Sequence, residues 1–407
     1  MFPLTQGKFL LDFLGKTLLE HQIDTARQAG LSEFVIVASP DNRSQVEEVA
    51  GRVKGVRVSI AMQDKPLGMA DAIKSAVGLI DSELIIVNPN DIFDVSAYTL
   101  LKEARQSGTA TAYILTREVK DYFPGGYLVT DSRGFLKRIM EKPGEGKEPS
   151  NLINLVVHLY TDPEKILDAV RNEPAGDDDT YERAVSALAG REKVGVIAYG
   201  GLWTAIKYPW HVLDAVRHFL DKSQPHISPS ASISPSATID GKVVIAENVR
   251  VMENAVVRGP AYIGRNSVIG NNCLVRGHSH IGDDCVIGFS TEIKGSYLGR
   301  RCWTHMNYLG DSIVGEDCNF GAGTITANWR LDEKNVPVKI DGVAVDTGRD
   351  KLGVIMGNHC RTGVNVSFMP GVKVGPDALV GPGVVVTTDV AQGERRLTGR
   401  KPYRRGK

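Results

Sequence analysis

Aliphatic side chains recur at every sixth position over a long stretch in the second half of the chain. The series contains only isoleucine and valine: Ile227, Ile233, Ile239, Ile245, Val251, Val257, Ile263, Ile269, Val275, Ile281, Ile287 and Ile293. A helix would place apolar residues three and four apart, and a half-buried strand would place them two apart. A period of six predicts instead a parallel, left-handed β-helix of hexapeptide repeats, in which each branched side chain points inward. Because three hexads close one coil, residues 18 positions apart should lie on neighbouring strands, about 4.8 Å apart.

The first half of the chain shows a different pattern, in which apolar segments alternate with amphipathic ones. We expect helices at 16–29, 42–51, 69–80 and 209–221, and strands at 33–39, 56–62, 83–88, 109–116, 135–140, 153–160 and 194–199. This alternation predicts a Rossmann-like α/β domain with a mainly parallel sheet. A Pro/Ser-rich stretch follows Lys222. We therefore place the α/β domain at 1–222, the β-helix at 223–392 and a basic tail at 393–407.

Composition sets limits on the function. The 407 residues include 48 Lys and Arg and 48 Asp and Glu, a balance that predicts no binding to nucleic acid or to an anionic membrane. The five cysteines are odd in number and form no C-x-x-C pair, so we expect reduced thiols rather than disulfides or a zinc site. The sequence shows no apolar run of 18 residues and no signal peptide. We therefore expect a cytoplasmic protein.

Motifs in the first half resemble those of the sugar-1-phosphate nucleotidyltransferase family. The matching segments are MFPLT at 1–5, GKTLLEH at 15–21, LGMADA at 67–72, ND at 90–91 and EKP at 141–143. The resemblance implies that a nucleotide and its sugar contact Lys8, Gln63, Gly68, Gly126, Glu141 and Asn154. It also implies that Asp91 holds Mg²⁺.

The same half departs from the family pattern at positions that matter for phosphoryl transfer. Ala205 stands where the family has its second magnesium-binding aspartate, and no glycine-rich phosphate loop precedes Met1 in this sequence. Phosphoryl transfer depends on metal ions and donors around the transferred group, so we expect a degenerate nucleotidyltransferase domain. An upstream start codon would restore the loop but not the aspartate. The alternative is a bifunctional enzyme that also joins UTP or dTTP to a sugar 1-phosphate.

The second half carries one long, ordered motif. Residues 291–328 read TEIKGSYLGRRCWTHMNYLGDSIVGEDCNFGAGTITAN. This resembles the acetyltransferase half of the bifunctional glucosamine-1-phosphate acetyltransferase/N-acetylglucosamine-1-phosphate uridylyltransferase family, and archaeal two-domain members resemble the whole chain. The resemblance implies acetyl transfer from acetyl-CoA to the amine of an amino-sugar 1-phosphate. The sequence does not distinguish glucosamine from galactosamine.

Transfer of an acetyl group from a thioester to an amine needs a base for the amine proton and a grip on the sugar phosphate. His305 lies within the motif and imidazole titrates near neutral pH, so we expect it to be the base. Arg276 and Lys294 are 18 residues apart. Their cations should therefore lie on neighbouring coils and converge on one phosphate. The alternative for these two residues is a solvated basic face.

The resemblance supplies further site residues. It adds Tyr308, Asn319 and Lys334 to the sugar site. It places acetyl-CoA beside Ala322, Asn328, Trp329, Asn358 and Pro382. Residues 329–353 interrupt the hexads and are expected to form a loop that covers a site. The resemblance also implies a homotrimer or a dimer of trimers, with sites shared between subunits.

Two other functions compete with this interpretation. One is a regulatory scaffold whose first domain only binds a sugar nucleotide. The other is a γ-class carbonic anhydrase, which ranks low because no trio of histidines stands at matching hexad positions. The basic tail is expected to be a solvated end, with contacts to coenzyme A phosphates as the alternative.

Overall fold

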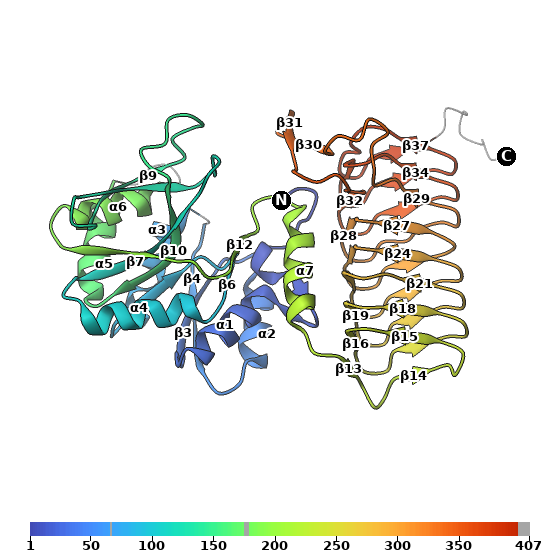
Figure 1. Ribbon diagram of the computed structural model, residues 1–407, viewed down its shortest axis with the longest axis horizontal. Helices are drawn as coiled ribbons and strands as arrows, with labels where there is room; N and C mark the ends of the chain where they lie inside the picture. The colour runs from blue at the N-terminus through green and yellow to red at the C-terminus, as the bar shows by residue number, and fades with distance from the viewer. Residues whose placement is uncertain (66, 175–178, 398–407) are drawn as a thin grey trace. The chain divides into compact units, whose positions relative to one another are not determined.

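The computed structural model describes residues 1–65, 67–174 and 179–397, and the chain forms two compact units (Figure 1). One unit is Leu18–Thr204. The other combines Met1–Thr17 with the chain from Ala205 onward, so helix α7 (His211–Lys222) belongs to the same unit as the β-helix. The domain boundary near Lys222 stays a prediction about the sequence, because the compact units divide the chain elsewhere.

The unit Leu18–Thr204 contains the alternating elements that the sequence predicts. Its helices are α1 (Leu18–Gln28), α2 (Arg43–Arg52), α3 (Met69–Ala76), η2 (Val77–Leu79), α4 (Ser96–Ser107), α5 (Pro163–Asn172) and α6 (Thr180–Ala189). Its main strands are β3 (Glu33–Ala38), β4 (Arg57–Met62), β5 (Leu84–Val87), β6 (Asp91–Phe93), β7 (Ala112–Glu118), β8 (Gly126–Thr130), β9 (Leu136–Glu141), β10 (Leu152–Tyr160) and β11 (Val194–Ala198). Each predicted helix and strand of this region is present, but α4, α5, α6, β6 and β8 were not predicted.

The sheet of this unit is mixed, so the prediction of a mainly parallel sheet is wrong for the described strands. The strand order is β11-β7-β10-β8-β9, with β5 also paired to β10. Strand β10 runs antiparallel to β5, β7 and β8, and β8 runs antiparallel to β9, while β11–β7 and β3–β4 are parallel pairs. The reason is the β8–β9 hairpin, because a short turn can join only antiparallel strands. The α/β class itself is confirmed.

Helices cover both faces of this sheet. Side chains from α3, α5 and α6, such as Ile73, Val170 and Leu188, are buried against one face. Side chains from α1 and α4, such as Ala26 and Leu101, are buried against the other. The sheet is therefore the middle of three layers, which is the arrangement that buries apolar side chains on both of its faces.

The β-helix consists of three parallel sheets, which we call its first, second and third faces (Figure 1). The first face is β13 (His226–Ile227), β16 (Val243–Ile245), β19 (Ala261–Ile263), β22 (Ser279–Ile281), β25 (Tyr297–Leu298), β28 (Ile313–Val314), β32 (Ile355–Met356) and β35 (Lys373–Val374). The second is β14 (Ser232–Ile233), β17 (Arg250–Val251), β20 (Val268–Ile269), β23 (Val286–Ile287) and β26 (Trp303–Thr304), then β33 (Arg361–Thr362), β36 (Leu379–Val380) and β38 (Arg395–Arg396). The third is β15 (Thr238–Asp240), β18 (Val256–Arg258), β21 (Leu274–Val275), β24 (Glu292–Lys294), β27 (Tyr308–Gly310), β29 (Ile325–Thr326), β34 (Ser367–Phe368) and β37 (Val385–Val386).

From Ile245 onward the hexad residues fill the interior of the coils, as the period of six predicts, whereas Ile227 in the first coil is 46% exposed. Ile245, Ile263 and Ile281 pair on successive coils and are fully buried. The five cysteines are buried free thiols, also as predicted. The coils extend beyond residue 392, because Arg395–Arg396 pairs with β36. Residues 398–407 of the predicted basic tail lie outside the described residues.

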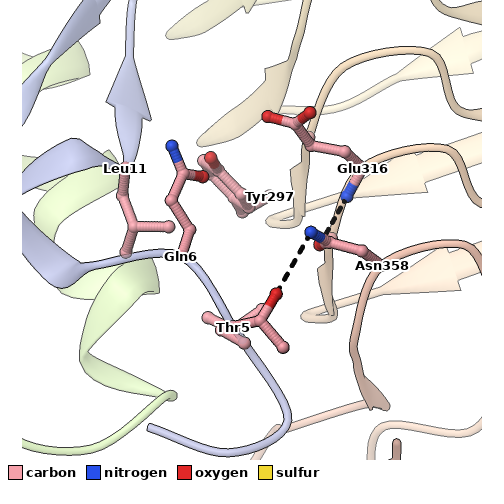
Figure 2. Close-up of a pocket in the computed structure, with 9 residues that line it drawn as sticks. Thr5, Gln6, Leu11, Tyr297, Glu316 and Asn358 are labelled. Atoms are coloured by element: carbon pink, nitrogen blue, oxygen red, sulfur yellow. Dashed lines mark hydrogen bonds between the residues drawn. The ribbon is translucent and has the colours of Figure 1, made fainter. Parts of the chain in front are cut away.

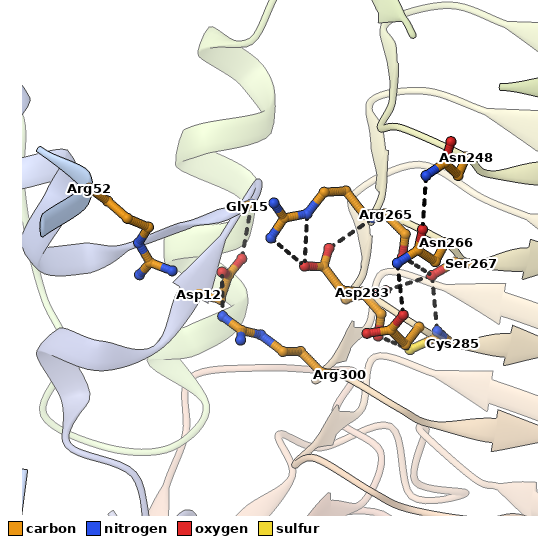
Figure 3. Close-up of polar contacts among 12 residues, drawn as sticks. Asp12, Gly15, Arg52, Asn248, Arg265, Asn266, Ser267, Asp283, Cys285 and Arg300 are labelled. Atoms are coloured by element: carbon orange, nitrogen blue, oxygen red, sulfur yellow. Dashed lines mark hydrogen bonds and ion pairs between the residues drawn. The ribbon is translucent and has the colours of Figure 1, made fainter. Parts of the chain in front are cut away.

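The chain's own N-terminal segment covers part of the first face. This segment carries η1 (Lys8–Leu10), β1 (Asp12–Phe13) and β2 (Lys16–Thr17). Arg300 Nη2 lies 3.3 Å from Asp12 Oδ2 (Figure 3), and the Leu14 N–H donates to His280 Nε2 at 3.1 Å. His280 is itself stacked between Tyr262 and Tyr297. These contacts cover part of the first face, whereas the predicted site residues Arg276, Lys294 and Tyr308 belong to the third.

A loop leaves the coils between residues 329 and 353, where the sequence predicts an interruption. It carries a hairpin of β30 (Pro337–Ile340) and β31 (Val343–Asp346). Val336 and Val338 are buried, and Arg349 forms an ion pair with Asp214 of α7. No described helix of either unit is long and apolar enough to span a membrane.

Candidate active sites

Arg276 and Lys294 lie side by side on the third face, as the 18-residue rule predicts. Val275 of β21 pairs with Ile293 of β24, so the residue after each occupies the neighbouring position on the next coil. Arg276 Nη1 lies 3.0 Å from Glu292 Oε1, and Lys294 Nζ lies 2.6 Å from Asp311 Oδ2. The Arg276 side chain is 47% exposed and that of Lys294 only 20%. Two cations held by carboxylates at one end of a strand form a pair that an anion can bridge.

Tyr308 and Asn328 extend this group, and we call these five residues the third-face cluster: Arg276, Lys294, Tyr308, Asp311 and Asn328. Asn328 Nδ2 donates to Asp311 Oδ2 and lies 3.3 Å from the Tyr308 hydroxyl. Burial raises the pKa of Tyr308, and the nearby Asp311 and Glu292 carboxylates raise it further. The hydroxyl is therefore protonated at neutral pH and able to donate. Asp311 and Glu292 were not predicted as site residues, although both lie within the motif at 291–328.

His305 lies at a shortened corner between the second and third faces. Strand β26 ends at Thr304 and β27 begins at Tyr308, whereas the preceding coil uses four residues, 288–291, at this corner. The tight turn gives Met306 a φ of 49°. Buried Asn307 fixes the corner, because its Oδ1 accepts from the His305 N–H and its Nδ2 donates to the carbonyls of Gly321 and Thr324 at 2.9 and 3.1 Å.

The His305 side chain is exposed at the corner between the second and third faces. Met306, Asn307 and the short strand β27 separate His305 from the level of Lys294. Lys294 pairs with Gly310 at the end of β27, and a strand rises about 3.3 Å per residue. The imidazole and the cations thus flank a stretch of third face roughly 10 Å long.

Two of the residues expected to line the acetyl-CoA site lie at the same corner as His305, between the second and third faces, but on later coils. Gly323 N–H donates to the Met306 carbonyl, and Asn365 N–H donates to the Ala322 carbonyl on the next coil. One coil further, Gly383 N–H donates to the Val364 carbonyl, which places Pro382 at the same corner. Trp329 follows Asn328 at the start of the 329–353 loop and is 43% exposed. Ala322, Pro382 and Trp329 therefore lie around the third face.

Three expected site residues lie elsewhere. Asn319 is on the second face, where it bridges Trp303 and Arg361. Lys334 is exposed in the 329–353 loop.

Asn358 lies at the corner between the first and second faces, beside a small pocket under the N-terminal segment (Figure 2). It donates to Thr5 Oγ1 at 3.3 Å and accepts from the Glu316 N–H at 3.0 Å. Asn319 and Asn358 therefore lie off the third face, which the linear motif could not reveal.

In the α/β unit, Gly126, Glu141 and Asn154 come together. Gly126 pairs with Glu141 across the β8–β9 hairpin. A Cβ at Gly126 would lie 3.0 Å from Glu141 Oε2, 3.3 Å from Asn154 Cβ and 2.9 Å from Ile139 Cγ2. Only glycine fits at this point of close approach.

Gln63 and Gly68 form a second group in this unit. Gln63 Nε2 donates to the Gly68 carbonyl at 3.2 Å and to Asp71 Oδ2 at 2.9 Å. Gly68 has a φ of 95° and precedes α3. Lys8 belongs to η1 in the other compact unit.

Asp91 is the residue that the resemblance assigns to Mg²⁺. It is buried at 5% exposure, and its Oδ2 accepts from Trp203 Nε1 at 3.1 Å. Among the described residues no group of three or more His, Cys, Asp or Glu side chains could hold a metal. One carboxylate still suits Mg²⁺, because this ion commonly takes one or two carboxylates together with substrate phosphates and water.

Two family models match the chain. One is described as a nucleotidyl transferase and matches residues 1–204; the other, described as a bacterial transferase hexapeptide of six repeats, matches 242–277, 260–295 and 353–388. The bifunctional sugar-1-phosphate nucleotidylyltransferase/acetyltransferase of Sulfurisphaera tokodaii is 34% identical, over 96% of this chain and 94% of its own length. Two proteins named bifunctional protein GlmU are also similar. The one from Methanocaldococcus jannaschii is 32% identical over 95% of this chain and 92% of its own, and one from Methanococcus maripaludis is 36% identical over 96% and 93%.

These matches run through both halves of the chain. They give no sign that the first domain is degenerate, and they favour the bifunctional alternative over that expectation. The replacement at Ala205 stands as a local departure within a domain that otherwise matches. The chain belongs to the family of bifunctional sugar-1-phosphate nucleotidyltransferase/acetyltransferases.

Proposed function

We propose that the β-helix transfers the acetyl group of acetyl-CoA to the amine of an amino-sugar 1-phosphate of the glucosamine 1-phosphate type. The observation that carries this proposal is the register of the third face. It sets the cations of Arg276 and Lys294 side by side at one end of β27, while His305 stands at the other end.

The substrate would lie along β27 between these groups. Its phosphate binds the two cations, and the Tyr308 hydroxyl hydrogen-bonds the sugar. The neutral His305 imidazole takes one proton from the amine as the nitrogen attacks the thioester carbon. The carbon–sulfur bond then breaks, coenzyme A leaves as a thiolate that accepts a proton, and the amide product remains. The exposed apolar surface of Trp329 suits the acyl-CoA chain beside Ala322 and Pro382.

A second copy of the chain would complete this site. Asn319 lies on the second face and Asn358 at the corner beyond it, so neither can reach a substrate on the third face of its own coil. We propose that both act on a substrate bound to a neighbouring subunit of a homotrimer. Lys334, on the 329–353 loop, acts in the same way.

A second activity, nucleotidyl transfer in the α/β unit, is favoured by the two-domain relatives that match over nearly their whole length. In this proposal Gln63 and Gly68 bind the base, and Gly126, Glu141 and Asn154 bind the sugar. Asp91 would hold Mg²⁺, which neutralises charge on the phosphates when bound. Because Ala205 supplies no carboxylate, phosphate oxygens and water would fill more of the coordination sphere. A cytoplasmic location remains a prediction.

The two activities can be tested separately on the purified chain. Release of coenzyme A is measured with glucosamine 1-phosphate and with galactosamine 1-phosphate. Release of pyrophosphate is measured with the N-acetylated sugar phosphate, Mg²⁺ and either UTP or dTTP. We expect both products.

Each negative result has a distinct meaning. No coenzyme A release from either amino sugar would contradict acetyl transfer. No pyrophosphate from any nucleotide, with acetyl transfer intact, would restore the interpretation of a degenerate first domain. Binding of a nucleotide sugar with neither product would indicate a regulatory scaffold.

A further inference from the structure

A chain of buried polar side chains leads away from Asn154 into the core of the α/β unit. His158 Nε2 lies 2.9 Å from Asn154 Oδ1, and His158 Nδ1 lies 2.7 Å from the Tyr181 hydroxyl. The Tyr181 hydroxyl lies 2.9 Å from that of Tyr160. His158 and Tyr160 are fully buried, and Tyr181 is 1% exposed. Buried polar groups of this kind are costly unless all are paired.

An irregularity in β10 brings Asn154 and His158 within reach. Leu155 pairs with Leu115 of β7, but the next pair is His158 with Ile114, so Val156 and Val157 are extra residues. In a regular strand, side chains four residues apart are separated by about 13 Å. The two extra residues reduce the separation of Asn154 and His158 along β7 from four steps to two, and both side chains stay on the same side of the strand. Bulges often re-aim side chains beside functional sites.

The direction of these hydrogen bonds follows from Tyr160, the last side chain in the series. Burial lowers the pKa of His158 to about 3, so the ring is neutral and carries one N–H. The described partners of the Tyr160 hydroxyl are Tyr181 and His158. If His158 Nδ1 carried the proton and donated to Tyr181, and Tyr181 donated to Tyr160, the Tyr160 O–H would be left without an acceptor. Orphaned buried donors are rare, so the tyrosine hydroxyls donate toward His158 Nδ1.

With Tyr160 donating to Tyr181, the Tyr181 hydroxyl donates to His158 Nδ1. The proton of the ring then sits on Nε2 and is donated to Asn154 Oδ1. The amide oxygen of Asn154 is thereby engaged on the core side, and its Nδ2 group turns the other way. Beside it lie Gly126 and the Glu141 carboxylate, which can only accept hydrogen bonds.

We infer that His158, held in its Nε2–H tautomer by Tyr160 and Tyr181, is a positioning residue that presents the Asn154 amide N–H groups to the sugar. This inference rests on the proposed nucleotidyl transfer in this unit. The pocket would offer one fixed donor, Asn154, beside one fixed acceptor, Glu141. A sugar with an acceptor oxygen next to a hydroxyl satisfies both. Without the relay the amide could rotate and present its oxygen, so that two acceptors would face the sugar.

The test removes the two hydroxyls without removing the rings. In Tyr160→Phe/Tyr181→Phe, His158 Nδ1 has no donor and the tautomer is no longer fixed. We expect the KM for the sugar 1-phosphate in pyrophosphate release to rise about tenfold, the usual worth of one well-placed hydrogen bond, with kcat changed less than twofold. The matched control is Tyr98→Phe/Tyr113→Phe, which removes two hydroxyls from buried tyrosines of the same unit outside the relay.

A spectroscopic measurement separates this inference from the proposed activity. In protein with ¹⁵N-labelled histidine, the His158 resonances, identified by their loss in His158→Asn, report which ring nitrogen carries the proton. An Nε2–H tautomer in the wild type that is lost only in the relay variant supports the inference even if the wild type releases no pyrophosphate. An Nδ1–H tautomer in the wild type overturns it, and so does an active wild type whose KM the relay variant changes no more than the control does.

Discussion

The candidate acetyl-transfer site uses residues from successive coils, whereas the candidate sugar site of the α/β unit uses residues from three strands that meet once. On the third face, Arg276 and Lys294 are neighbours because every coil repeats the one before it. In the α/β unit, Gly126, Glu141 and Asn154 are neighbours because a hairpin and a bulged strand bring them together. In the β-helix, the fixed repeat length decides which functional residues are neighbours. In the mixed sheet, the packing of particular strands decides it. The β-helix site should therefore lose activity when a functional side chain is removed. The sugar site of the α/β unit should lose activity when atoms are added to its packed residues.

The largest effect is expected from removing the base of the repeating site. His305→Ala should lower kcat for acetyl transfer roughly 10²–10⁴-fold, the range of general-base catalysis. The side chain is exposed, so the thermal unfolding temperature should be unchanged, and pyrophosphate release should be unaffected. His359→Ala, at another exposed corner, is the matched control. A near-normal rate for His305→Ala would show that another group is the base.

The packed site should respond strongly to one added methyl group. Gly126→Ala would place a Cβ within 3.0 Å of Glu141 Oε2 and 2.9 Å of Ile139 Cγ2. Overpacking of this kind costs about 1–3 kcal/mol, so kcat/KM for pyrophosphate release should fall about 10–100-fold while acetyl transfer is retained. Gly51→Ala, where an added Cβ meets nothing within 4 Å, should be neutral. Equal activity of the two variants would mean that the sugar does not bind at Gly126.

The two cations of the third-face cluster should act as one group. Arg276→Ala or Lys294→Ala should each raise the KM for the amino-sugar phosphate about tenfold, the effect of losing a charge-assisted hydrogen bond. The double variant should lose less than the product of the two, because both cations hold one phosphate. The KM for acetyl-CoA should be unchanged. Additive losses, or equal effects on both substrates, would place the cations at different ligands.

The smallest change in activity is expected from loosening the corner that carries the base. Asn307→Ala removes the amide that accepts from the His305 N–H and donates to two carbonyls. Unpaired buried groups cost about 1–3 kcal/mol, so the unfolding temperature should fall by several degrees, and kcat for acetyl transfer about fivefold. Loss of stability with unchanged kcat would show that the corner does not need this amide to aim the imidazole.

Much of the β-helix could be predicted from the sequence, because its period fixes the register. The inward position of Ile263 and Ile281 and the pairing of Arg276 with Lys294 both follow from counting. What counting missed is local. The strand at Arg395–Arg396 lies beyond the last aliphatic hexads, and the separation of Asn319 from the third face depends on which of three faces a residue occupies.

The α/β unit was less predictable, for a physical reason. Strand and helix segments were visible as apolar runs, but an apolar run does not state its direction, so the antiparallel partners of β10 were missed. The bulge at Val156 and Val157 has no recognisable sequence signal, since valine is common in regular strands. Without the bulge, His158 reads as one more buried strand residue, and its bond to Asn154 is invisible in the sequence.

The three-residue corner at His305 has a consequence for length variation along the chain. Loops that leave the coils, such as 329–353, accept many residues because both of their ends return to the same strand spacing. The corner between Thr304 and Tyr308 has no such freedom, since one inserted residue would restore the four-residue turn of the preceding coil and change the position of His305 relative to β27. Insertions and deletions should therefore be tolerated in whole coils or in the loop, and excluded from this corner. Single-residue insertions along the β-helix, each assayed for acetyl transfer, should therefore locate the active site at the corner where activity is lost, without any side chain being replaced.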